Sequence, residues 1–136
     1  MAHPAVQRQR PAARDGGAAV VEFTLVSILL VFLFLMIMQV GLVLHARNVM
    51  VSAAQEGARL AANADRSPAE GVARTRQAIA GSLGSELVAR LEITPLPPAG
   101  DPAVVGIRIS GPLPFLFAPV GPLRLTVEGH ALKEGR

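Results

Sequence analysis

The longest uncharged segment of the chain is the feature that most constrains its fold. Residues 23–44 carry no charged side chain and consist mostly of Leu, Val, Ile, Phe and Met. At about 1.5 Å rise per residue, a helix over these 22 residues spans the roughly 30 Å hydrocarbon core of a bilayer. The segment is longer than the apolar part of a secretory signal, which has about 7 to 15 residues. We therefore expect one transmembrane helix that stays in the mature protein.

The composition of the rest of the chain excludes several classes of function. Residues 45–136 suffice for one small domain with a thin core. The chain has no cysteine, so it has no disulfide, thiolate metal ligand or lipid-bearing cysteine. Its net charge of +3 is dispersed and only five residues are aromatic, so no nucleic-acid-binding face is expected. Three arginines (8, 10 and 14) precede the apolar run, against Arg47 and Arg59 beyond it, which favours a cytoplasmic N-terminus.

Composition and periodicity divide the chain into three parts. Residues 1–17 are rich in Pro, Arg, Ala and Gly, and we expect them to be a disordered cytoplasmic leader. Residues 18–64 contain no proline and are expected to form one long helix that crosses the membrane at 23–44. Residues 65–136 are expected to form an extracytoplasmic α+β head.

Turn and capping signals predict the elements of the head. Ser67, Pro68 and Glu70 match a capping box that begins a second helix, which ends near Leu83. Alternating polar and apolar residues predict three short antiparallel strands, joined by proline-rich loops, at residues 87–94, 104–110 and 123–132. One apolar face of such a sheet needs a cover, and the extramembrane helix segments are available to provide it.

Glu22 lies at the edge of the apolar run, where an ionisable side chain is costly unless it has a partner or reaches the interface. The simpler interpretation is that this carboxylate complements the helix dipole and extends toward the headgroups. The sequence around it, GAAVVEF at residues 17–23, resembles the processing site of type IV prepilins and pseudopilins. In that family an inner-membrane peptidase cleaves after the glycine, and the glutamate is the fifth residue of the mature chain, followed by an aromatic residue.

The resemblance assigns roles to four residues. It places the cleavage between Gly17 and Ala18, with Glu22 as the fifth mature residue and Phe23 after it. Together with HARNVMVSAAQEGARLAA at 45–62, the motif resembles the TadE-like pseudopilins of Tad (Flp) pilus systems. Cleavage creates a cationic amine at Ala18, and in a bundle of such helices Glu22 of one subunit is placed to neutralise the amine of its neighbour.

A second pattern is a row of small residues spaced by four, Ala53, Gly57 and Ala61, beside a parallel row of alanines at 54, 58 and 62. Such rows let backbones approach closely, which predicts helix packing against the chain's own sheet or against neighbours. The alternative is composition alone, because alanine is the best helix former. Glu56 and Arg59 are three residues apart and are expected to form at most a weak surface pair.

No constellation predicts catalysis or cofactor binding. His3, His45 and His130 are dispersed, and no metal-ligand spacing is visible. Glu128 and His130 share a predicted strand face, but no nucleophile accompanies them. The apolar cluster at 115–117 is expected to close one end of the sheet, with membrane contact or docking as the alternative.

These observations predict a structural protein that is not an enzyme: a pseudopilin or minor pilin in the inner membrane, which serves pilus or secretion assembly. Its expected partners are the lipid bilayer, a prepilin peptidase and other pilins or pseudopilins, with no nucleic acid, cofactor or small-molecule substrate. Two alternatives remain. One is an unprocessed single-pass protein whose head binds an envelope partner, and the other is an accessory subunit of a membrane enzyme or transporter.

Overall fold

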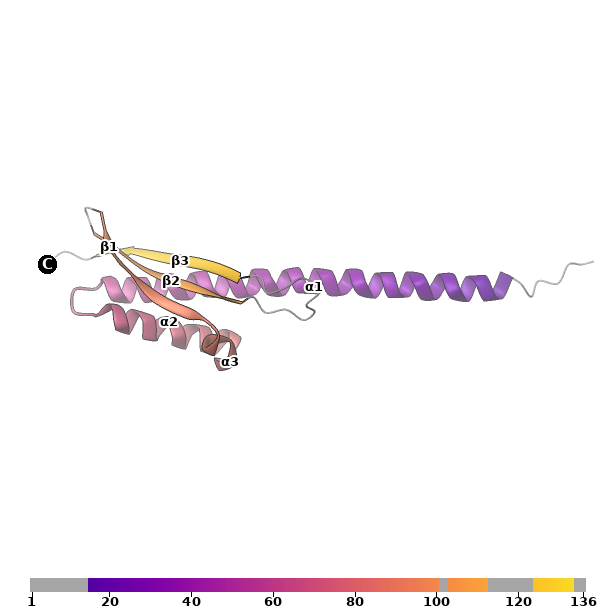
Figure 1. The fold of residues 1–136 in the computed structure, drawn as a ribbon, viewed down its shortest axis with the longest axis horizontal. Helices are drawn as coiled ribbons and strands as arrows, with labels where there is room; N and C mark the ends of the chain where they lie inside the picture. Colours follow the sequence, from indigo (N-terminus) through magenta and orange to yellow (C-terminus); the bar gives the residue numbers. More distant parts are fainter. Residues whose placement is uncertain (1–14, 101–102, 113–123, 134–136) are drawn as a thin grey trace, which may run out of the picture. The chain divides into compact units, whose positions relative to one another are not determined.

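The computed structural model describes residues 15–100, 103–112 and 124–133. They form, in chain order, α1 (Asp15–Ala62), α2 (Pro68–Leu83), α3 (Ser85–Ala89), β1 (Glu92–Ala99), β2 (Val104–Pro112) and β3 (Arg124–Leu132) (Figure 1). Contacts divide the chain into two compact units, Met1–Met38 and Gln39–Arg136. The long N-terminal helix, the shorter second helix and the three-stranded antiparallel sheet confirm the predicted α+β fold.

The first half of α1 is apolar and uncovered. Most of its large side chains between Val20 and Leu44 are exposed, with Phe23 at 74%. The helix carries an 18-residue window of mean hydropathy 2.8, none of it buried inside the protein. Because so much apolar surface is unfavourable in water, and the helix satisfies its own backbone hydrogen bonds, this segment is long and apolar enough to cross a membrane.

The helix α1 begins at Asp15, earlier than the predicted start at residue 18. Residues 15–17, expected to be disordered, are therefore helical. Two glycines in the first turn do not prevent this, because the propensity cost of glycine is about 1 kcal/mol per residue and the following helix is long. The rest of the leader, residues 1–14, lies outside the described residues.

The second half of α1 packs against α2 through glycines on both helices. A Cβ atom added to Gly57 would lie 2.6 Å from the carbonyl oxygen of Gly71, and one added to Gly71 would lie 2.6 Å from that of Gly57. The two backbones therefore touch. The buried hydroxyl of Thr75 lies 2.9 Å from the Gly71 oxygen and 3.3 Å from the Ala53 oxygen, which satisfies its hydrogen bonding between the helices.

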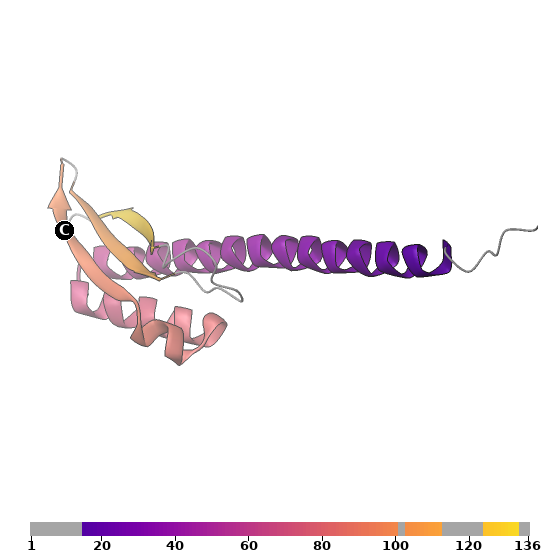
Figure 2. The same cartoon turned by 45° about the vertical axis from the view of Figure 1, so that its right-hand side comes forward.

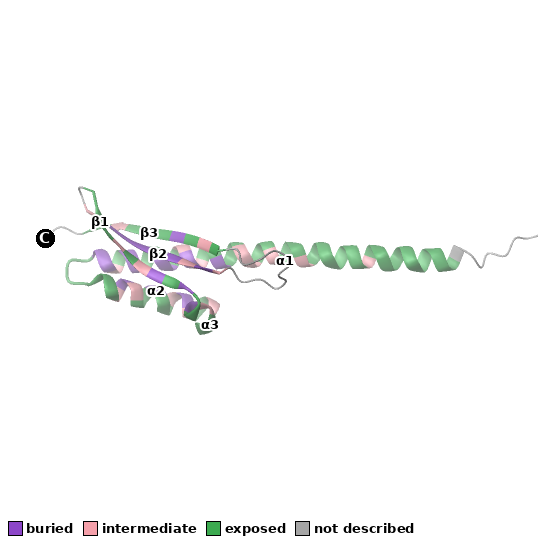
Figure 3. Cartoon of the chain, viewed as in Figure 1, coloured by how far each residue is buried: buried purple, intermediate pink, exposed green. Residues whose placement is uncertain are grey.

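The three strands form a sheet of order β1-β2-β3, and helices cover one of its faces (Figures 1 and 2). Register places Ile93, Ile109 and Val127 side by side across the sheet, and all three are buried beneath the helices (Figure 3). Gly129 is the closest point of contact, because a Cβ added to it would lie 2.6 Å from the Ala54 carbonyl oxygen of α1. The strand β3 therefore lies directly on the helix backbone.

The predicted capping box at the start of α2 is confirmed. The Ser67 N–H donates to the Glu70 carboxylate at 2.7 Å, and the Glu70 N–H donates to the Ser67 hydroxyl at 3.3 Å. The Ser67 N–H and, secondarily, Arg66 hold the pKa of the Glu70 carboxyl below its ordinary value. The chain thus fixes where α2 begins, and with it the position of Gly71 opposite α1.

Two predictions in the head are wrong. The strand predicted for 87–94 begins only at Glu92, because residues 85–89 form α3. The spacing of Leu87, Val88 and Leu91 fits one helical turn as well as a strand, and so few residues do not separate the two periods. The strand then continues to Ala99 through a proline-rich stretch expected to be a loop, because β1 is an edge strand where proline is tolerated.

Glu56 and Arg59 were expected to form at most a weak surface pair, and Glu56 binds a different cation in the structure. Glu56 instead accepts two hydrogen bonds from Arg74 of α2, at 2.9 and 2.6 Å. Nε and Nη2 of the Arg74 guanidinium group both donate to Oε1 of Glu56, and the packing of α2 brings the guanidinium group within reach. The apolar cluster at 115–117 and Leu123 lie outside the described residues.

Substitution of Gly57 by Ala tests the backbone contact. We expect Gly57→Ala to lower the free energy of unfolding by about 1 to 3 kcal/mol, because the added methyl group meets the α2 backbone. Gly81→Ala in α2 is the matched control: nothing lies within 4 Å of its added Cβ, so we expect stabilisation by up to about 1 kcal/mol. Thermal unfolding of the detergent-solubilised chain, followed by circular dichroism, measures both. Equal stabilisation by the two substitutions would contradict the predicted packing.

Candidate functional site

The residues of the predicted processing motif lie on the first turns of α1. Gly17, Ala18, Glu22 and Phe23 are all helical and exposed. Gly17 has no positive φ, and a Cβ atom added to it would meet nothing within 4 Å. Neither backbone conformation nor packing against the described residues therefore requires glycine at this position. The same holds for Gly16, its neighbour in sequence.

The peptide bond between Gly17 and Ala18 lies in the first turn of α1. The first four N–H groups of a helix have no intrahelical acceptor, and each glycine there costs about 1 kcal/mol relative to alanine. This turn therefore opens more readily than the alanine- and valine-rich turn that follows it. A protease that requires extended backbone therefore meets a smaller barrier here than in the next turn of the helix.

Glu22 is exposed on α1, immediately before the fully apolar stretch. Among the described residues it has no ion-pair or hydrogen-bond partner. In contrast, the hydroxyl of Thr24 donates to the Val20 carbonyl oxygen of its own helix at 2.8 Å and needs no external partner. The chemistry open to Glu22 is therefore that of a carboxylate beside hydrocarbon that lacks a cationic partner among the described residues.

The apolar part of α1 also carries a shallow hollow of about 240 Å³, lined by Ser27, Ile28, Val31, Phe32 and Leu35. All five residues lie on one side of the helix at helical spacing. A lipid chain or an apolar side chain from another helix fits such a surface. The hollow shows no cluster of polar groups that would bind a hydrophilic ligand.

The small-residue rows lie inside the unit Gln39–Arg136. Ala53, Gly57 and Ala61 are buried, with Gly57 and Ala61 against Gly71 of α2. The parallel row faces the same core and the sheet, and its alanines at 54, 58 and 62 are at most 3% exposed. Both rows are occupied by the chain's own elements, so these side chains do not form a free surface for neighbouring subunits.

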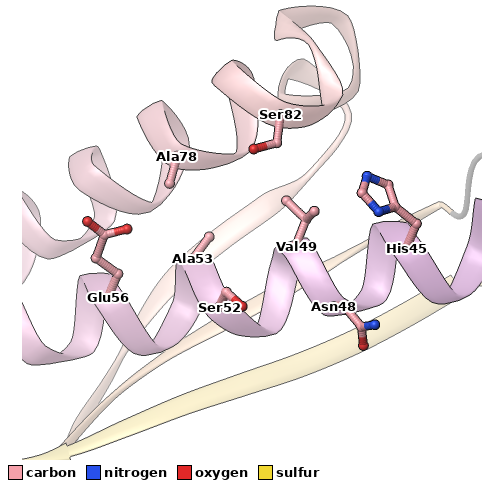
Figure 4. Close-up of a pocket in the computed structure, with 8 residues that line it drawn as sticks. All are labelled: His45, Asn48, Val49, Ser52, Ala53, Glu56, Ala78 and Ser82. Carbon is pink, nitrogen blue, oxygen red and sulfur yellow. The ribbon is translucent and has the colours of Figure 1, made fainter.

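A groove of about 340 Å³ lies between α1 and α2 and is lined by His45, Asn48, Val49, Ser52, Ala53, Glu56, Ala78 and Ser82 (Figure 4). His45 and Glu56 point toward α2, whereas Asn48 points to the other side of α1. The Glu56 carboxylate is already bound by Arg74. Among the described residues no group of three or more His, Cys, Asp or Glu side chains could hold a metal ion.

Glu128 and His130, which were predicted to share a strand face, lie together on the outer face of the sheet. Glu128 accepts a hydrogen bond from Arg108 at 2.7 Å, and His130 lies 3.4 Å from its other oxygen. Arg108 lowers the pKa of the Glu128 carboxyl. Within the part of the chain that the structure describes, no hydroxyl nucleophile hydrogen-bonds to this group, so the arrangement is an exposed ion pair.

Sequence reasoning missed the partners of the small-residue rows, Gly71 and Gly129, and the cation that binds Glu56. A signal existed for Gly71, because an isolated glycine inside a helical pattern often marks close packing. For Gly129 the signal was a glycine within a strand pattern, which indicates close approach of another backbone. Neither signal indicates which element makes the approach.

Comparison with known proteins gives one result. The TadE-like protein family matches residues 17–59. No curated protein and no solved structure matches the chain. The matched region begins at Gly17 and contains the apolar half of α1 and the stretch EGAR, but none of α2, α3 or the sheet. TadE-like proteins are not an enzyme family. The match confirms the resemblance seen in the sequence: residues 17–59 are similar to TadE-like proteins, and together with the apolar helix this similarity indicates a membrane-anchored protein associated with Tad pili.

Proposed function

We propose that the chain is a pseudopilin or minor pilin of a Tad (Flp) pilus or a related secretion apparatus, and that a prepilin peptidase processes it between Gly17 and Ala18. The observation that carries the proposal is Gly17 itself. The family match and the motif both begin at this glycine, yet no conformational or packing requirement of the described chain explains it. A requirement imposed by another protein, the peptidase, accounts for it.

In this proposal the chain has three parts. Residues 1–17 are a cytoplasmic leader that is removed, residues 18–64 form the long helix, and residues 65–136 form the head outside the inner membrane. The helix crosses the bilayer at residues 23–44, where its large apolar side chains are exposed. The distribution of arginines on the two sides of this segment supports a cytoplasmic N-terminus.

Processing changes the charge at the start of the helix. Hydrolysis of the peptide bond leaves the new carboxylate on the leader and the new amine on Ala18, which is cationic at neutral pH in water. The Glu22 carboxylate, which has no partner among the described residues, then pairs with the Ala18 amine of a neighbouring subunit. Two opposite charges buried together cost far less than either charge buried alone, so the pair sets the register between adjacent helices.

Assembly proceeds through the first half of α1. The head uses the small-residue rows for its own packing, whereas the apolar surface of residues 20–44 is mostly exposed among the described residues. Lipid covers this surface before assembly, and the helices of other pilins cover it afterwards. The role is structural, and the chain is the substrate of a peptidase.

Substitutions of the two glycines test the processing site. We expect Gly17→Val to abolish cleavage, because a branched side chain next to the scissile bond obstructs the peptidase and stiffens the backbone. Gly16→Val is the matched control, since both glycines have open surroundings in the structure but only Gly17 adjoins the cut. Intact mass of the membrane-extracted variants distinguishes them. Cleavage of the Gly17→Val chain at a normal rate would contradict the assignment.

Replacement of Glu22 tests its role after cleavage. We expect Glu22→Ala to be processed but to reduce assembly more than tenfold, because one buried charge is then left without the other at a cost of about 3 to 5 kcal/mol. Thr24→Val is the control, because that hydroxyl bonds only within its own helix. Pilus yield and co-purification with other pilins provide the measurement. If Glu22→Ala assembles as well as the parent, Glu22 is only an interfacial charge.

A further inference from the structure

The hydrogen-bond pattern of the sheet shows which backbone groups of β3 face outward. The Lys133 N–H donates to the Ala103 carbonyl oxygen at 2.8 Å, so these opposed residues form a hydrogen-bonded pair. Along two antiparallel strands, such hydrogen-bonded pairs alternate with pairs of opposed residues that do not hydrogen-bond to each other. The N–H and C=O groups of the intervening residues therefore point away from β2, and these residues are Arg124, Thr126, Glu128, His130 and Leu132.

The other edge of the sheet, formed by β1, is unsuited to pairing with a further strand. The same alternation along β1 places Pro95 where its nitrogen faces the free edge, and Pro97 and Pro98 follow it. A proline cannot donate to a ladder, and prolines on an edge strand prevent pairing with another chain. The strand β3 contains no proline and, among the described strands, pairs only with β2. In the ribbon of Figure 1 no other described strand lies beside its outward edge.

The side chains at the two ends of this edge have no partner among the described residues. Leu132 is 64% exposed, and among the described residues it is the only large apolar side chain exposed outside the run of α1 from Val20 to Leu44. Arg124, at the other end of β3, is exposed and has no ion-pair partner among the described residues. Glu128 between them is already bound to Arg108.

We propose that the edge of β3 binds an extended segment of another protein as an antiparallel fourth strand. The segment presents a carboxylate opposite Arg124 and an apolar side chain opposite Leu132. Main-chain hydrogen bonds supply affinity, and the charge and the apolar residue at the two ends supply specificity. The inference goes beyond the proposed function and does not depend on cleavage of the leader.

A second copy of this chain fits the edge poorly. The strand β3 runs along α1 in the same direction, with Gly129 on Ala54 and Ala131 beside the cluster of Ala61 and Ala62. Antiparallel pairing of two β3 strands in full register would set Arg124 of each copy opposite Leu132 of the other and Glu128 opposite Glu128, so neither end of the edge would meet its complement. Parallel pairing about a two-fold axis parallel to β3 would turn one sheet over relative to the other. The helix-covered face of one copy would then lie beside the charged outer face of the other.

Two peptides test the proposal on the full chain in detergent micelles. The probe has nine residues, with leucine first, glutamate last, and threonine and serine alternating between them. Its antiparallel register places the leucine opposite Leu132 and the glutamate opposite Arg124. The control peptide ends in lysine. We expect fluorescence anisotropy to show tighter binding of the glutamate peptide, and Arg124→Glu to reverse the preference, each by about three- to fivefold.

Thr126→Pro tests the backbone contribution. It removes an outward N–H that makes no bond to β2, so we expect both peptides to lose binding while circular dichroism stays unchanged. If this variant fails to fold, the charge exchange at Arg124 still decides the outcome. The proposal is overturned if the parent binds neither peptide, if Arg124→Glu leaves the preference unchanged, or if a photocrosslinker at Thr126 in cells captures only a second copy of this chain.

Discussion

The rest of the structure depends on an apolar surface that is left exposed among the described residues. The first half of α1 exposes most of its large side chains, whereas the second half supplies most of the helical part of the core. Because so large an apolar surface is unfavourable in water, a lipid phase or other helices must supply its contacts. One continuous helix therefore carries two kinds of interface, and the transition between them lies near the boundary at Gln39.

Close backbone packing explains how so small a head holds together without disulfides. A domain of this size buries little apolar area, so each contact contributes a large share of its stability. Gly57 against Gly71, and Gly129 against Ala54, bring three backbones together and increase the dispersion contacts around them. The TadE-like match ends within this region. The N-terminal part of the matched region is therefore exposed for contacts with lipid or other helices, and its C-terminal part packs in the interior of the head.

The parts of the fold that local chemistry determines could be predicted from the sequence. The apolar length of α1, the capping box at Ser67 and the alternation along β3 each act over a few residues. The position of β1 could not be predicted from the sequence. Prolines are acceptable in a strand only when its edge is free, and whether the edge is free depends on the order of strands in the sheet.

For the candidate site, the sequence supplied the motif residues but not their surroundings. Coordinates were needed to show that a Cβ atom added to Gly17 would meet no described residue within 4 Å, and that Glu22 has no partner among the described residues. The pairing of Glu56 with Arg74 depends on how α2 folds back along α1, which is a tertiary arrangement and not a local spacing. In the proposed function a peptidase recognises this motif by its sequence, on a segment that is exposed in the structure.

The central claim is that the mature chain begins at Ala18, with a new amine one helical turn before Glu22. The most direct measurement is N-terminal sequencing of the membrane-extracted protein from cells with and without the pilus-system peptidase. The account predicts a sequence that starts at Ala18 when the peptidase is present and at the original N-terminus when it is absent. Recovery of the unprocessed N-terminus from peptidase-containing cells that build normal pili would contradict it.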